Sequence, residues 1–85
     1  MSMVQQIIQA VTATQRQIDD QMAKLRSYNG QIDKVMQQVQ SELSGSTQQY
    51  AQEMLNQLQQ TKNQVEDTIN KLQAAKDKLT QVRAI

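Results

Sequence analysis

The sequence contains no cysteine, histidine, proline, phenylalanine or tryptophan. Without cysteine it can form neither a disulfide framework nor a thiolate metal site. Without histidine or cysteine a nucleophilic serine or threonine would lack a base, and the carboxylates stand at helix-surface spacings. Asp19 and Asp20, for example, are neighbours that point in different directions on a helix. We therefore predict a protein that is not an enzyme and that binds no cofactor and no metal ion.

Long apolar runs are also missing. The N-terminal stretch is interrupted by Gln5, Gln6 and Gln9, has no basic flank and precedes no small-residue cleavage site, so it does not resemble a Sec signal peptide. No segment approaches the roughly 18 apolar residues of a membrane-spanning helix. A helix pair on a membrane surface would need a lysine-lined face beside bulky apolar residues, which this chain does not supply. We expect no membrane span.

Charge of one sign is not concentrated anywhere. Nine basic and eight acidic residues give a net charge of +1, and both signs are spread along the chain. Sequence-independent binding of nucleic acid needs clustered cations, and single strands also stack on aromatic side chains. The only aromatic residues are Tyr28 and Tyr50. We expect no nucleic-acid partner.

What the sequence does contain is a regular spacing of aliphatic residues. Counting in sevens gives an unbroken apolar series: Val4, Val11, Ile18, Leu25, Ile32 and Val39. A companion series, four residues further on, is mixed: Ile8, Gln15, Met22, Asn29, Met36 and Leu43. Two such series form the seam of a long amphipathic helix, which we place at about residues 3–43.

Asn29-Gly30 is the strongest turn signal inside this segment. The sevenfold phase nevertheless passes from Leu25 to Ile32 without slipping, whereas a chain reversal would usually reset it. We therefore interpret Gly30 as a weak point within a continuous helix, costing about 1 kcal/mol relative to alanine.

The second half repeats the pattern. Its main series is Ala51, Leu58, Val65, Leu72 and Leu79. The companion series three residues further on is Met54, Thr61, Thr68, Ala75 and Val82, with Leu55 and Ile69 beside it. These spacings predict a second helix over about residues 47–84, of nearly the same length as the first.

The stretch SELSGSTQQY, residues 41–50, separates the two helices. Gly45 suits the left-handed residue that follows a helix end. Ser46 is a favourable N-cap, and Gln49 completes a capping-box pattern. Because the turn is short, at about residues 44–46, we predict an all-α, antiparallel helix-turn-helix hairpin that occupies residues 1–85 as a single unit.

A hairpin with one apolar stripe per helix buries little surface on its own. Two hairpins packed together would form a four-helix bundle, so we expect dimerisation with the same chain or with another helical protein. The interface seam would then consist of Val11, Ile18, Leu25, Ile32, Val39, Leu58, Val65, Leu72 and Leu79. Polar seam residues such as Gln15, Asn29, Thr61 and Thr68 would need hydrogen-bond partners and could select register.

The central break also resembles the loop of the WXG superfamily, small helical hairpins exported by bacterial type VII secretion systems. That family has a Trp-x-Gly motif midway along a chain of similar length, commonly followed by an aromatic residue on the next helix. Here Leu43, Ser44 and Gly45 stand at the motif and Tyr50 follows. With leucine in the place of tryptophan, the chain resembles the divergent small partners of larger type VII substrates, including LXG-type toxins.

The resemblance implies a type VII secretion substrate, or a partner or chaperone of one, that acts by helix-helix pairing. Its partner would be a second copy or another helical type VII substrate, such as an LXG-type toxin. The protein would be secreted by a non-Sec route, or be cytoplasmic before export. The family's C-terminal export motif, a tyrosine three residues before an acid, is absent from the final residues KLTQVRAI. The alternative is a structural coiled-coil adaptor without a secretion role.

Overall fold

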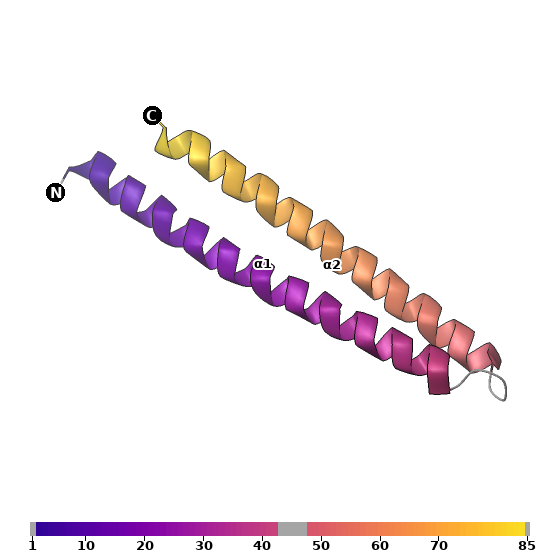
Figure 1. Ribbon diagram of the computed structural model, residues 1–85. Helices are drawn as coiled ribbons and strands as arrows, with labels where there is room; N and C mark the ends of the chain where they lie inside the picture. The colour runs from indigo at the N-terminus through magenta and orange to yellow at the C-terminus, as the bar shows by residue number, and fades with distance from the viewer. Residues whose placement is uncertain (1, 43–47, 85) are drawn as a thin grey trace.

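The computed structural model describes residues 2–42 and 48–84. It contains helix α1, Met3–Glu42, and helix α2, Gln48–Arg83. The helices contact each other along the chain and run in opposite directions, so that the N- and C-terminal ends lie together (Figure 1). The predicted all-α helical hairpin is thereby confirmed.

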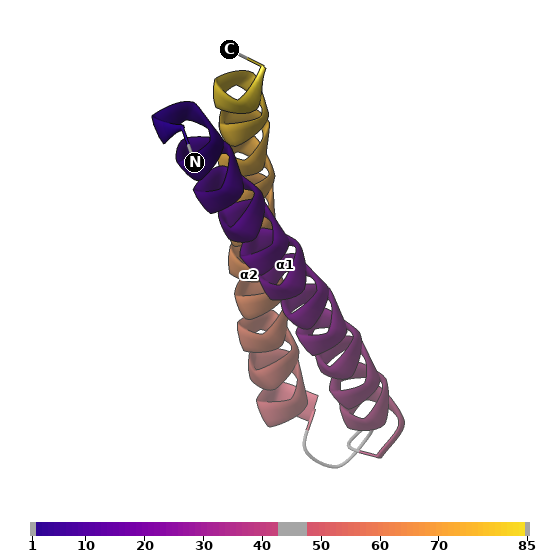
Figure 2. The same ribbon diagram turned by 90° about the vertical axis from the view of Figure 1, so that its left-hand side faces the viewer.

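The molecule is a thin rod, and its Cα atoms span 67 × 14 × 12 Å. Viewed from the side, α1 and α2 are inclined to one another and cross in projection (Figure 2). With 40 residues, α1 alone is about 60 Å long at ~1.5 Å per residue. A rod of two helices has no third layer, so every residue that does not face the other helix remains open to solvent or to a partner.

Helix α1 begins with a capping box, which was not predicted from the sequence. The Gln5 backbone N–H donates to Ser2 Oγ at 3.1 Å, and the Ser2 backbone nitrogen donates to Gln5 Oε1 at 3.4 Å. Each contact satisfies a backbone donor that lacks a partner at a helix start. Ser2 and Gln5 have the spacing that defines the motif, so the motif can be recognised in the sequence.

Helix α1 passes through Asn29 and Gly30 without a break, as the unshifted sevenfold phase predicted. A Cβ atom added to Gly30 would meet no atom within 4 Å. Within the hairpin, therefore, neither a turn nor a close contact requires glycine at this position.

Gly30→Ala is expected to stabilise the hairpin by about 1 kcal/mol, because alanine loses less backbone entropy in a helix than glycine does. The melting temperature should rise by roughly 4–8 °C, measured by circular dichroism. Ala23→Gly, at an exposed position one heptad earlier, should lower it by a similar amount. A lower melting temperature in Gly30→Ala would contradict the open space found around this residue.

We call the contact between α1 and α2 the inner seam. It contains the only hydrophobic residues that are buried in the described part of the chain: Val11, Met22, Ile32, Val39 and Ala51. Of the predicted interface residues, Val11, Ile32 and Val39 are buried, and six are half-buried: Ile18, Leu25, Leu58, Val65, Leu72 and Leu79. The structure places all of them where α1 meets α2. The contact between helices of one molecule accounts for their burial, and no second molecule is needed for it.

The companion series predicted for the second helix is wrong at four of its five positions. Met54, Thr68, Ala75 and Val82 are exposed and only Thr61 is half-buried, whereas Leu55, Lys62, Ile69 and Lys76 are all half-buried beside the Leu58 series. The second heptad series of a seam can lie either three or four residues after the Leu58 series. Both spacings alternate steps of three and four residues, so the sequence pattern fits either one. The correct series contains Lys62 and Lys76. Lysine is counted as polar in a heptad pattern, although its aliphatic stem packs well against apolar surface.

Candidate helix-docking site

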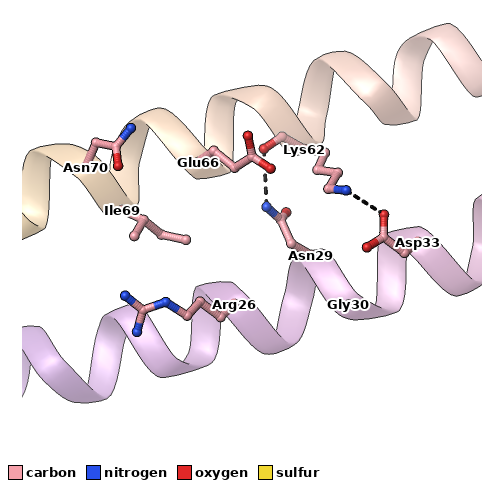
Figure 3. Close-up of a pocket in the computed structure, with 8 residues that line it drawn as sticks. All are labelled: Arg26, Asn29, Gly30, Asp33, Lys62, Glu66, Ile69 and Asn70. Atoms are coloured by element: carbon pink, nitrogen blue, oxygen red, sulfur yellow. Dashed lines mark hydrogen bonds and ion pairs between the residues drawn. The ribbon is translucent and has the colours of Figure 1, made fainter.

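Two polar clusters connect the helices across the inner seam, and they repeat the same arrangement. In the central clamp, Asn29 Nδ2 donates to the backbone carbonyl of Lys62 at 3.3 Å, and Lys62 Nζ lies 2.8 Å from Asp33 Oδ1 (Figure 3). An amide on α1 thus bonds the backbone of a lysine on α2, whose ammonium group pairs with an acid one turn further along α1.

The open-end clamp has the same parts two heptads away. Gln15 Nε2 donates to the backbone carbonyl of Lys76 at 3.3 Å, and Lys76 Nζ lies 2.7 Å from Asp19 Oδ1. Since α1 and α2 are antiparallel, two heptads forward on α1 correspond to two heptads back on α2. The repetition shows that the register between the helices is constant over this length, which fixes how their outer positions line up.

Gln15 is the better satisfied of the two amides. It also donates to Thr80 Oγ1 at 2.8 Å, and Arg83 donates to Gln15 Oε1 at 2.9 Å. The central amide differs, because Asn29 is only 7% exposed and its Oδ1 atom has no hydrogen-bond partner among the described residues. A buried acceptor without a donor costs about 1–3 kcal/mol.

The central clamp borders an open groove of about 480 Å³ on one side of the hairpin. Its lining combines the bare backbone of Gly30 with charges of both signs, from Arg26, Asp33, Lys62 and Glu66 (Figure 3). We call this the polar side. None of the large hydrophobic residues exposed in the described part of the chain lines it.

The ion pair of the central clamp changes the titration of its lysine. The hydrogen bond to Asp33 raises the pKa of Lys62 above its ordinary value, against the opposing effect of desolvation, and the charges of Asp33 and Glu66 act in the same direction as the hydrogen bond. A raised pKa in the folded state stabilises the hairpin below the unfolded-state value, and this contribution is lost as the pH rises through the folded-state value.

Lys62→Met should therefore flatten the loss of stability at alkaline pH, above about 10.4 where unfolded lysine titrates. Denaturant unfolding of both proteins at neutral pH and at about pH 11 tests this difference. Lys78→Met is the matched control, because Lys78 is exposed and makes no ion pair among the described residues. An equal alkaline loss in Lys62→Met and wild type would show that the pair does not contribute. The effect is small, because both members of the pair remain partly exposed.

The opposite side of the hairpin is apolar. Five large hydrophobic residues there are each 42–48% exposed: Ile7, Tyr28, Val35, Met54 and Val82. They belong to two heptad series, one on each helix, which lie beside the inner seam. In an antiparallel pair these equivalent series flank the same side. Accordingly, Ile7 of α1 and Val82 of α2 line one hollow of about 210 Å³, together with Val4, Ile8 and Arg83.

We call this surface the outer face. It comprises Ile7, Thr14, Gln21, Tyr28 and Val35 on α1 and Met54, Thr61, Thr68, Ala75 and Val82 on α2. None of these positions carries a charge, in contrast to the polar side. The hydroxyls of Thr61 and Thr68 donate to carbonyls of their own helix, Gln57 and Gln64, at 3.0 Å. Apart from the Gln21 amide and the Tyr28 ring with its hydroxyl, the outer face therefore presents methyl groups and aliphatic chains to a neighbouring helix.

The predicted turn motif falls largely outside the described residues. Leu43, Ser44 and Gly45 lie outside the described residues, as do Ser46 and Thr47, so the turn and the N-cap expected there stay predictions. Tyr50 lies in the first turn of α2 and is 72% exposed.

Sequence reasoning identified Gln15 and Asn29 but missed their clamp partners Asp19, Asp33, Lys62 and Lys76. The signal was present, because each amide is followed by an aspartate after four residues and the two pairs stand two heptads apart. On one helix such a pattern looks like an ordinary solvated face. It becomes informative only when matched to two lysines with the same separation on the other helix.

In the described part of the chain there is no group of three or more potential metal ligands of the kind that holds an ion. Neither described helix has a segment apolar and long enough for membrane crossing. In comparisons with known proteins, no family model, no curated sequence and no solved structure matches the chain. Its function is therefore inferred from the residues and their geometry.

Proposed function

We propose that this protein is a small type VII secretion substrate, or the partner of a larger one, and that it works by packing its outer face against a second helical hairpin. The observation that carries the pairing is the uncharged, half-exposed outer face on one side of the hairpin only. Large apolar residues gathered on one face of a small protein usually mark a surface for a partner. A four-helix bundle would cover that face.

The secretion role is supported by the position of the chain reversal. Leu43, Ser44 and Gly45, the residues that resemble the family's central motif, stand in the sequence between the described helices α1, Met3–Glu42, and α2, Gln48–Arg83. Two helices of nearly equal length on either side of such a motif are the arrangement that the resemblance implies.

Pairing is tested by measuring the mass of the purified protein in solution and after co-expression with the product of the neighbouring gene. Wild type should form a complex with itself or with that protein. Val35→Glu should weaken the complex at least tenfold, because it places a charge within the apolar contact. Gln37→Glu, an exposed position on the other side of α1, is the matched control and should bind normally. A strict monomer that binds no helical protein would contradict the proposal.

Export is tested separately in the native host. The protein should accumulate in the culture medium, and this accumulation should stop when the ATPase of the type VII system is deleted. If the protein pairs but stays inside the cell in both strains, the structural coiled-coil adaptor would be the correct function. The two experiments thus separate pairing from secretion.

A further inference from the structure

The dipeptide Asn29-Gly30 lies inside α1 and forms no turn, and no contact within the hairpin requires its glycine. Its covalent chemistry is distinctive, because an asparagine amide can react with the backbone nitrogen of the next residue. Asparagine is accordingly among the thermolabile residues of proteins. The reaction is fastest before glycine, which has no side chain to hinder the approach or the backbone rotation. Asn56, Asn63 and Asn70 precede glutamine or lysine, so Asn29 is the asparagine predisposed to react.

The folded hairpin opposes this reaction. The Gly30 N–H lies in the interior of α1, where each backbone N–H bonds to the carbonyl four residues earlier. Helical backbone dihedrals also hold this nitrogen away from Asn29 Cγ, so the ring that joins the two atoms does not close within a helix. Asn29 is only 7% exposed, and its Nδ2 atom donates to the Lys62 carbonyl at 3.3 Å. Unfolding removes all of these restraints together.

We propose that Asn29 is a deamidation site that the folded hairpin protects and the unfolded chain exposes. In the unfolded chain, the Gly30 backbone nitrogen loses its proton to solvent base and attacks Asn29 Cγ. A C–N bond forms, the Cγ–Nδ2 bond breaks, and Nδ2 takes up a proton from solvent and leaves as ammonia. Water then opens the cyclic imide at either of its carbonyls, which gives aspartate or isoaspartate. Water is the only reactant consumed, so the chain needs no enzyme for this step.

Neither product fits the inner seam. An aspartate at position 29 places a carboxylate oxygen where Nδ2 now donates to the Lys62 carbonyl, so two acceptors face each other. The Lys62 ammonium group is already paired with Asp33 at 2.8 Å, so the buried charge has no cation of its own. Isoaspartate lengthens the backbone by one carbon, which disrupts the regular hydrogen-bonded rings of α1. Deamidation therefore turns a transient unfolding into a lasting loss of stability.

Incubating the full chain in mildly alkaline buffer with increasing guanidinium chloride tests the protection. After dilution and digestion with trypsin, the peptide from Ser27 to Lys34 should have gained about 1 Da, because an amide NH2 is replaced by a carboxyl OH. The rate of this gain should follow the unfolded fraction measured by circular dichroism. It should be at least tenfold higher in the fully unfolded protein than in the folded one.

Gly30→Ala is the matched variant for the chemistry. When both proteins are fully unfolded, it should deamidate at Asn29 at least tenfold more slowly than wild type, because the alanine methyl group hinders ring closure. Equal rates in the folded and unfolded wild type would overturn the proposal. Faster deamidation at another asparagine of the unfolded chain would overturn it as well.

Asn29→Asp reproduces one product and tests its effect on the fold. Its melting temperature should be lower than that of wild type by at least roughly 10 °C. Asn56→Asp is the matched control, because Asn56 is exposed and its Oδ1 atom, which accepts from Gln52 at 3.3 Å, is retained in aspartate. The control should change the melting temperature by less than about 4 °C. Equal melting temperatures of the two variants would overturn the inferred loss of stability.

Discussion

Met22→Asp is expected to unfold the hairpin. Met22 is 3% exposed and lies in the inner seam, where a carboxylate would be buried without a cation assigned to it. Such a change costs on the order of 4 kcal/mol. A chain of this size has about 4–13 kcal/mol of total stability, and a rod with a single seam lies at the low end of that range. Far-UV circular dichroism at 25 °C should show most of the helical signal lost.

Ala23→Asp is the matched control, because Ala23 is the next residue on the same helix and is exposed. The two variants have the same change in charge, and both replace a good helix former with aspartate. Ala23→Asp should keep its helical signal and lose no more than about 1 kcal/mol. Comparable stability of the two variants would mean that Met22 does not face α2, and the register of the inner seam would then be wrong.

Asn29→Leu should stabilise the hairpin by about 2 kcal/mol, although it removes a hydrogen bond between the helices. The substitution eliminates a buried Oδ1 atom that has no partner in the described structure and adds apolar contact in the seam. The carbonyl of Lys62 lies within α2, so it keeps its helical bond. The melting temperature should rise by roughly 10 °C.

Gln15→Leu provides the comparison, since it changes the equivalent amide of the open-end clamp. There the amide donates to the Lys76 carbonyl and to Thr80 and accepts from Arg83, so its removal loses these three hydrogen bonds. It should be neutral or destabilising. If both leucine variants stabilised the hairpin equally, the missing hydrogen-bond partner of Asn29 would not be the cause. The added apolar contact of leucine in the inner seam would then explain both results.

The fold was predictable from the sequence to a large extent. The series from Val4 to Val39 fixed α1, and its unshifted phase excluded a turn at Asn29-Gly30, although this dipeptide favours one. The cluster around Gly45, where residues that disfavour a helix gather, predicted two helices separated near the middle of the chain, and the hairpin of α1 and α2 agrees with that division. These features are local, and a heptad count detects them without knowledge of any contact.

The candidate site was less predictable. The series containing Met54 and Val82 was assigned to the inner seam, but it belongs to the outer face. Lys62 and Lys76 were not included in the predicted seam, although both are half-buried and their ammonium groups reach Asp33 and Asp19. Hydropathy assigns one character to a whole lysine, whereas its stem and its charged end occupy different environments.

The sequence alone determined that the chain forms two long helices and reverses once near its middle, because helix periodicity and turn chemistry act over a few neighbouring residues. Only the tertiary structure decided which flank of the Leu58 series faces α1, and therefore which flank remains outside. That choice depends on pairing Gln15 and Asn29 with particular lysines far away in the chain. The free energy of such pairing exists only when both helices are in place, so no single stretch of sequence encodes the apolar outer face and the polar side opposite it.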